Sequence, residues 1–234
     1  MKTLALETSG LGGGVAVLDG ERILAHSRLA ASPRTAQSLA PTIREVLHTA
    51  GWRPADVELV AVAIGPGSFT GLRLGVTSAK VFAYAVGAKL IGVDTLEVIA
   101  SQATCEADEI RPVLPAERRQ VFACWFRRDN HGSLIRLRPA EIVDIDRWLA
   151  GLQPGVAITG PALAQLADRL PAGVEVAAKT LWQPTATTVG RLAVERFKTG
   201  QSDDVWKLVP LYLRRSAAEE QRDRQSASRT TSEG

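Results

Sequence analysis

A glycine-rich segment at residues 65–73, with the sequence GPGSFTGLR, constrains the fold more than any other part of the chain. An apolar run at 57–64 precedes it and predicts a buried strand, and a run at 72–86 follows it and predicts a helix. Glycines and hydroxyl residues at such a turn leave backbone N–H groups without helical partners, and the helix dipole adds partial positive charge. The segment therefore predicts either an anion site or a turn that lets strand and helix pack closely.

An anion site here differs from a Walker P-loop, because Gly71 is followed by Leu72 and Arg73 instead of lysine and a hydroxyl residue. The turn after the first expected strand, at residues 7–10, carries two hydroxyl groups that could face a nucleotide. The candidate anion or nucleotide contacts are Thr8, Ser9, Gly65, Gly67, Ser68, Thr70, Gly71 and Arg73.

The order of expected elements repeats along the chain. In the first half we expect strands at 2–7, 14–18, 22–29, 57–64 and 89–93, and helices at 39–50, 72–86 and after Asp94 or Thr95. In the second half we expect strands at 111–114, 120–127, 134–137, 156–159 and 174–177, and helices from Asp144 or Asp146, at 161–170 and at 185–198. A duplicated βββαβαβα order is typical of the actin and sugar-kinase class. We therefore expect an α/β fold of two tandem actin-like or ribonuclease-H-like lobes, at 1–104 and 105–214, followed by a flexible tail at 215–234.

Small residues recur every four positions in the helix after the glycine segment. They are Gly71, Gly75, Ala79, Ala83 and Gly87. Such a stripe lets another helix approach closely. The occupant of this groove is either a partner protein or the chain's own first helix.

The chain carries little of the usual chemistry of catalysis or metal binding. Its three histidines lie far apart in sequence, and its two cysteines, Cys105 and Cys124, lack CxxC spacing. Glu7 stands where kinases of the actin-like class carry an aspartate that organises magnesium, and Ser68 is not the central serine of a GxSxG motif. We expect no catalytic residue, no metal site and no disulfide.

Composition places the chain among soluble globular proteins, because 45% of its residues are hydrophobic and only 23% are charged. No apolar run approaches the roughly 18 residues that span a bilayer, so we expect a cytoplasmic protein without membrane contact. The formal charge of +3 allows contact with nucleic acid without establishing it.

Several segments together resemble the TsaB (YeaZ) family. They are LALETS at 4–9, VAVL at 15–18, SLAPTI at 38–43, GPGSFTGLRLGV at 65–76 with Ala79 and Lys80, and PLYLR at 210–214. The resemblance extends over nearly the whole chain in element order, and the glycine segment is its most specific part.

The resemblance implies a non-catalytic partner and activator of TsaD, which, with the ATPase TsaE, places a threonylcarbamoyl group on the tRNA adenosine next to the anticodon. It implies a heterodimer with TsaD, allows a homodimer of the isolated chain, and leaves tRNA to be contacted through the complex. No cofactor is expected to bind tightly, although ATP or ADP could bind at the interface of the complex. The alternative is an active ATP-dependent enzyme or M22-type peptidase of the actin-like class.

In the family, the contact with TsaD or a second copy involves the helices that correspond to 36–50 and 72–86. The interface residues expected from this are Leu39, Ile43, Leu72, Gly75, Val76, Ala79, Phe82 and Ala83. The chain departs from the family at Glu7, where aspartate is usual, and at Thr35 and Ala36, where His-Ser is usual. It also has PAERRQVF at 115–122 in place of the family's Asp-Ala-Arg-x-Gly-Glu-Val-Tyr. These departures put a ligand role of the cleft in doubt and leave the helix contact untouched.

Overall fold

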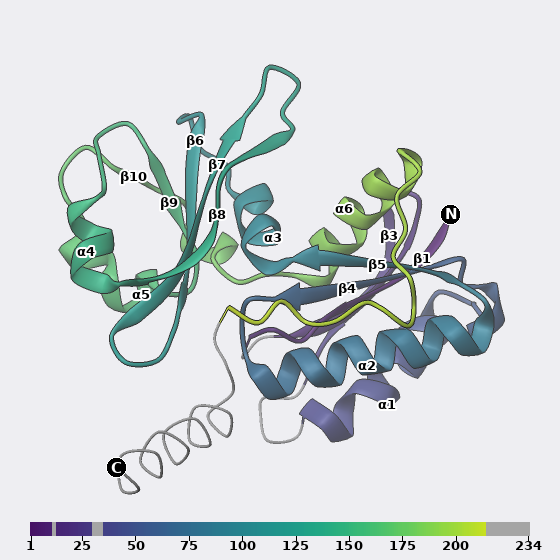
Figure 1. Ribbon diagram of the computed structural model, residues 1–234. Coiled ribbons are helices and arrows are strands. Elements are labelled where there is room, and N and C mark those ends of the chain that lie inside the picture. The colour runs from purple at the N-terminus through teal and green to yellow at the C-terminus, as the bar shows by residue number, and fades with distance from the viewer. Residues whose placement is uncertain (11–12, 30–34, 214–234) are drawn as a thin grey trace, which may run out of the picture.

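The computed structural model describes residues 1–10, 13–29 and 35–213, which form two lobes that are each built on a five-stranded sheet (Figure 1). The expected α/β fold of two tandem lobes is confirmed. The expected tail at 215–234 lies outside the described residues.

The first sheet has the strand order β3-β2-β1-β4-β5. Its strands are β1 (Lys2–Glu7), β2 (Gly14–Asp19), β3 (Arg22–Arg28), β4 (Leu59–Gly65) and β5 (Lys89–Asp94). The first three strands are antiparallel, whereas β1, β4 and β5 are parallel. The carboxyl ends of these parallel strands therefore meet at one edge of the sheet, beside the second lobe (Figure 1).

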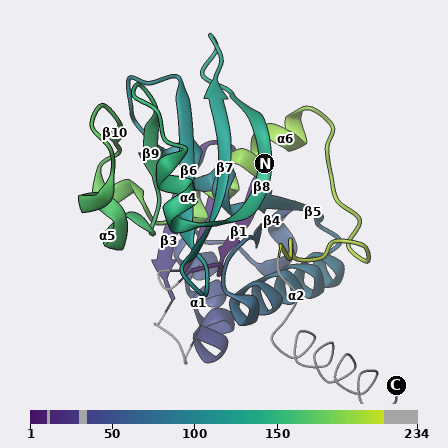
Figure 2. The ribbon, with the colours of Figure 1, turned by 60° about the vertical axis from the view of Figure 1, so that its left-hand side comes forward.

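Helices cover both faces of the first sheet. The helices α1 (Thr35–Thr49) and α2 (Phe69–Val86) lie side by side below it in both views (Figures 1 and 2), where they pack on Leu4 and Leu6. The helix α6 (Ala186–Lys198) covers the other face, where Ala5 is buried beneath it. The apolar residues of β1 alternate between these two cores, as the period of a strand requires.

The second sheet has the order β10-β9-β6-β7-β8. Its strands are β6 (Glu109–Pro115), β7 (Gln120–Arg128), β8 (Leu134–Asp144), β9 (Ala157–Thr159) and β10 (Glu175–Val176). One face packs on α4 (Ile145–Ala150) and α5 (Leu163–Leu166), and the other packs on α3 (Thr95–Gln102). Short 3-10 turns lie at Pro54–Asp56, Ala167–Arg169 and Lys179–Leu181.

The expected order of elements is confirmed in both halves, with differences in their bounds. The helix α2 begins at Phe69 rather than Leu72, because the Ser68 side chain caps it by accepting a hydrogen bond from the Gly71 N–H. The helix expected at 161–170 is divided into α5 and the 3-10 turn at Ala167–Arg169. The strand β8 extends well beyond 134–137, since an edge strand tolerates Pro139 and exposed charges that hide a strand pattern.

The expected boundary of the second lobe at 105–214 differs from the structure. The second sheet ends with β10, and the chain then returns to the first lobe. There, Val189 and Ala193 of α6 are fully buried on the first sheet, and Asp203 bridges to Leu90 at its edge. The physical reason is that the first sheet has a second apolar face, which α6 removes from water.

The turn between β6 and β7 holds two arginines in the left-handed region, Arg118 at φ 60° and Arg119 at φ 58°. This conformation brings Cβ too close to the following carbonyl and costs roughly 1–2 kcal/mol for a residue other than glycine. The family segment has glycine where this chain has Arg119.

We therefore expect Arg119→Gly to increase the free energy of unfolding by about 1 kcal/mol, because removal of Cβ relieves this strain. The lost ion pair with Asp146 is exposed and offsets little of the gain. Urea unfolding measures the change, with Arg119→Lys as the control that keeps Cβ and should match the parent. A decrease in stability for Arg119→Gly would contradict the strain argument.

In the part of the chain that the structure describes, no helix combines the length and the apolar character needed to cross a membrane.

Candidate functional site

The glycine segment is bonded to the turn that follows β1. The Ser68 N–H donates to the Ser9 carbonyl at 2.7 Å, and the Thr8 hydroxyl donates to the Gly71 carbonyl at 2.8 Å. Thr8 and Ser9 are buried. Several polar groups expected to hold an anion therefore bond to one another inside the chain.

Gly71 of this segment and Gly75, one turn further along α2, permit an unusually close approach of the helix to the same turn. A Cβ atom at Gly71 would lie 2.1 Å from the Thr8 carbonyl oxygen, and one at Gly75 would lie 2.1 Å from the Thr8 hydroxyl. Real Cβ atoms essentially never make such short contacts. Of the two interpretations of the segment, the geometry favours close packing of strand and helix.

The candidate anion contacts fall into two groups. Thr8, Ser9, Gly67, Ser68 and Gly71 are brought together by the contacts just described. The others lie apart or face elsewhere: Gly65 packs on Leu211, Thr70 is exposed, and Arg73 donates to the Tyr212 hydroxyl at 3.1 Å. Their role as an anion site stays a prediction.

Glu7 ends β1 and is almost fully buried. Its Oε1 accepts hydrogen bonds from the Ser9 N–H at 2.6 Å and from the Ser9 hydroxyl, whereas Oε2 has no partner among the described residues. Burial raises the pKa of Glu7 to about 7, against the opposing effect of the two Ser9 bonds. A substantial fraction of this carboxyl is therefore neutral at physiological pH.

This arrangement does not fit a magnesium-bound nucleotide held by this chain alone. One oxygen of the buried Glu7 carboxyl already accepts the two Ser9 bonds, and the neighbouring Thr8 hydroxyl donates to the Gly71 carbonyl. Among the described residues, no group of three or more His, Cys, Asp or Glu side chains could hold a metal ion. ATP or ADP at the interface of a complex stays a prediction.

The small-residue stripe of α2 faces the interior of the first lobe, where it packs on the sheet and shares a core with α1, the chain's own first helix. Gly75 contacts Thr8, and Ala79 and Ala83 are buried in the core between the sheet and the two helices. The expected interface residues Leu39, Ile43, Leu72, Gly75, Val76, Ala79 and Ala83 are all buried in the same way. Phe82 is partly buried. Small residues indicate a close approach without indicating which body approaches, and here the sheet and α1 approach; an interface at these positions stays a prediction.

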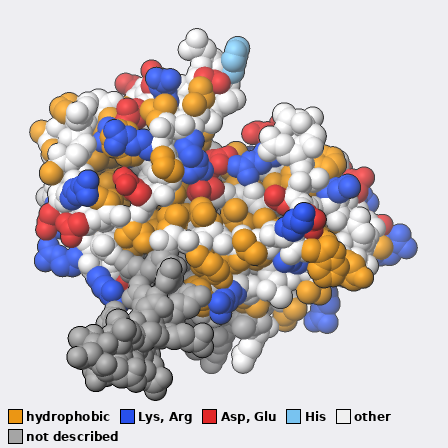
Figure 3. All heavy atoms as spheres, in the orientation of Figure 1, with side chains coloured by type: hydrophobic (Ala, Val, Ile, Leu, Met, Phe, Trp, Pro, Cys, Tyr) orange, Lys and Arg blue, Asp and Glu red, His pale blue; other side chains and the backbone are white. Residues whose placement is uncertain are grey.

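A different face of α2 is exposed and apolar. Val81 and Tyr84 are 63% and 66% exposed, and beside them lie Trp206 and Val209, which are 70% and 65% exposed. The rings of Tyr84 and Trp206 are in edge contact at 5.1 Å. These four residues are called the α2–strap surface below, and Figure 3 shows orange side chains gathered over this part of the first lobe.

The strap is the segment 203–213, which runs along α2 and is bonded to it at several points (Figure 1). The Lys80 ammonium donates to the carbonyls of Trp206 and Leu208 at 3.2 and 3.0 Å. At the far end, Tyr212 packs on Phe69 with ring centroids 5.0 Å apart. The motif at 210–214 is recognisable in the sequence, but its contact with α2 is not, because that contact joins residues more than 120 positions apart.

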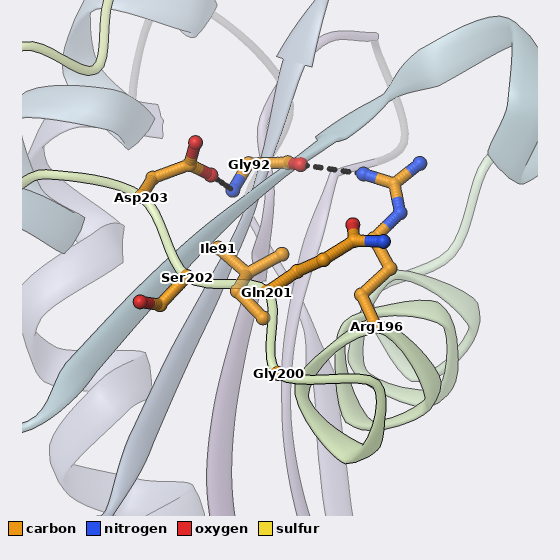
Figure 4. Close-up of a pocket in the computed structure, with 7 residues that line it drawn as sticks. All are labelled: Ile91, Gly92, Arg196, Gly200, Gln201, Ser202 and Asp203. Carbon is orange, nitrogen blue, oxygen red and sulfur yellow. Dashed lines mark hydrogen bonds between the residues drawn. The ribbon is translucent and has the colours of Figure 1, made fainter.

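A polar pocket of about 380 Å³ lies at the edge of the first sheet (Figure 4). Its lining residues are Ile91, Gly92, Arg196, Gly200, Gln201, Ser202 and Asp203. Two of these residues bond to the backbone of Gly92. Arg196 Nη1 donates to the Gly92 carbonyl at 2.8 Å, and the Gly92 N–H donates to Asp203 Oδ2 at 2.7 Å. None of the expected site residues lines this pocket.

Comparison with known proteins relates this architecture to a family. The family model for tRNA N6-adenosine threonylcarbamoyltransferase (TsaD) matches residues 29–169, which is more than half of the chain. The chain belongs to this family. Within it, the resemblance to TsaB (YeaZ) is confirmed by relatives that are similar over nearly the full length.

Two of these relatives are named tRNA threonylcarbamoyladenosine biosynthesis protein TsaB. The Bacillus subtilis protein is 28% identical over 226 residues, with 94% of this chain and 96% of the relative covered. The Escherichia coli protein is 26% identical, with 93% and 96% covered. The solved structure of YeaZ from Pseudomonas aeruginosa superposes with a TM-score of 0.79 at 24% identity, over 91% of this chain and 99% of that one. This structural similarity supports the same two-lobed fold for the TsaB family.

Proposed function

We propose that this chain acts in the formation of threonylcarbamoyladenosine in tRNA, as a non-catalytic partner and activator of a TsaD-type transferase. Its TsaB relatives are named for that biosynthesis, and the matching family model is that of the transferase. The proposal includes a heterodimer with TsaD, association with TsaE in the larger complex, and contact with tRNA through that complex in the cytoplasm.

The α2–strap surface is the observation that carries the partner role. Exposed apolar patches mark interaction sites in soluble proteins. Burying a large apolar side chain stabilises a complex by about 1.5–3 kcal/mol. Val81, Tyr84 and Trp206 supply three such side chains next to one another.

The interior of the first lobe explains how this surface is held. Thr8 and Ser9 fix the start of α2, and Lys80 anchors the strap to the same helix. A surface that is already ordered loses less conformational entropy on binding. The residues around Glu7 support the non-catalytic part of the proposal, since their polar groups are largely engaged with one another.

Val81→Asp is expected to weaken binding of the chain to its TsaD-type transferase at least about tenfold, because a charge would be buried in an apolar contact. Isothermal titration calorimetry with the two purified proteins measures the dissociation constant. Ile135→Asp is the matched control, because Ile135 is 45% exposed but lies on β8 of the other lobe. Equal affinity of Val81→Asp and the parent would contradict docking through this surface. Loss of self-association alone would assign the surface to a homodimer.

A further inference from the structure

The helix α3 joins the two lobes. It follows directly from β5 of the first sheet, with Asp94 as its N-cap. Its apolar residues Leu96 and Ile99 nevertheless pack with Ile110 and Phe126 on the second sheet. Figure 1 shows α3 between the two lobes; its first residue follows a strand of one lobe, and its apolar residues pack on the sheet of the other.

A cluster of four charged side chains surrounds the start of α3. Arg136 of β8 donates to Asp94 Oδ2 at 3.0 Å and lies 3.5 Å from Glu97. Glu97 in turn accepts two bonds of 2.7 Å from Arg196 of α6. Asp94 is only 11% exposed and Arg136 33%, so these pairs are screened much less than surface pairs. The cluster connects the second sheet, α3 and the helix that covers the first sheet.

The chain passes between the lobes twice: α3 is the first connection, and the segment near residue 185 returns to the first lobe. Gln102, at the end of α3, is hydrogen-bonded to this second connection. Its amide nitrogen donates to the carbonyls of Leu181 and Gln183 at 3.1 and 2.7 Å. Its amide oxygen accepts from the N–H and the hydroxyl of Thr185 at 3.0 and 2.9 Å. The side chain thus makes all four of the hydrogen bonds that such an amide readily forms.

We propose that Arg136 and Gln102 are positioning residues that lock the two lobes at one angle. Arg136 bonds to the start of α3, and Gln102 bonds the end of the same helix to the segment that returns to the first lobe. When either contact is lost, α3 separates from the lobes by local opening, at a lower free energy than global unfolding requires. This inference concerns the joint between the lobes and is independent of the proposed function.

Cys124 is a native probe of this joint. It is 1% exposed, lies in the cluster of buried residues that contains α3, and contacts Arg136 through its sulfur at 3.2 Å. Burial raises the pKa of its thiol to about 11, and the nearby Arg136 opposes that rise. Removing the Arg136 charge therefore makes the thiol less reactive chemically, so faster labelling in such a variant reports greater exposure.

The test measures the rate at which Ellman's reagent labels Cys124 in a Cys105→Ser background, in water and in low concentrations of urea. Arg136→Gln and Gln102→Ala are each expected to label at least about tenfold faster, with a weak dependence on urea that indicates local opening. Arg138→Gln is the matched control, because Arg138 also lies on β8 and stacks on an aromatic ring, but on Trp125. It should label at the parent rate.

Acceleration in both variants with a urea dependence well below that of global unfolding supports the lock. Unchanged labelling in either variant overturns it. So does acceleration whose urea dependence equals that of global unfolding followed by circular dichroism, since a merely structural role would produce that result.

Discussion

Gly71→Ala is expected to lower the free energy of unfolding by about 3 kcal/mol, although glycine to alanine in a helix ordinarily stabilises by up to about 1 kcal/mol. The reversal follows from geometry. The new methyl group would lie 2.1 Å from the carbonyl oxygen of Thr8, a backbone atom that cannot rotate away. The Thr8 backbone and α2 must then separate, and the bond from the Thr8 hydroxyl to Gly71 is lost.

Urea unfolding followed by circular dichroism measures this change. Thr77→Ala on the exposed side of α2 is the control and should be neutral or slightly stabilising. If Gly71→Ala were as stable as the parent, α2 and Thr8 would not be in close contact at this position. That result would support the anion-site interpretation instead.

The second large effect is a loss of stability as pH rises. Burial raises the pKa of Glu7 to about 7 in the folded protein, from an ordinary value of 4.5. Below pH 4.5 the carboxyl is protonated in both states. Between 4.5 and 7 the folded state holds a proton that the unfolded state has released, so stability falls as pH rises. Above about pH 7 the loss is complete and amounts to about 3 kcal/mol.

Glu7→Gln removes this titration while keeping an oxygen that can accept the Ser9 bonds. Comparison of the two proteins by urea unfolding at several pH values between 4.5 and 8 isolates the contribution of Glu7. The difference in stability should shift in favour of the variant by about 3 kcal/mol across this range. A constant difference would show that the carboxyl is already ionised in the folded protein at pH 5.

The fold was largely predictable because strand and helix periods are local properties of a sequence. The alternation in β1 and the capping Gly51 at the end of α1 are of this kind. The bounds of β8 were not, since an exposed edge strand has no buried face to impose alternation. The return of α6 to the first lobe was also missed, because an amphipathic helix does not specify which of two sheets it covers.

The candidate site, like the fold, could be predicted only in part from the sequence. The glycine segment and the polar turn at Thr8 were both identified in the sequence, but their contact was not, because it depends on the parallel pairing of β1 with β4. It did not predict that α2 turns its small residues inward and Val81 outward. The available signal was that apolar residues of this helix, Val81 among them, continue beyond the face that carries the stripe.

Reconstitution of tRNA threonylcarbamoylation from purified components, with and without this chain, tests the central claim most directly. With transferase, TsaE, acyl donor, ATP and tRNA present, we predict that product forms only slowly until the chain is added, and that the chain alone shows no ATP hydrolysis or peptidase activity. Equal rates of product formation with and without the chain would contradict its role as an activating partner, and substantial turnover by the chain alone would identify it as an enzyme instead.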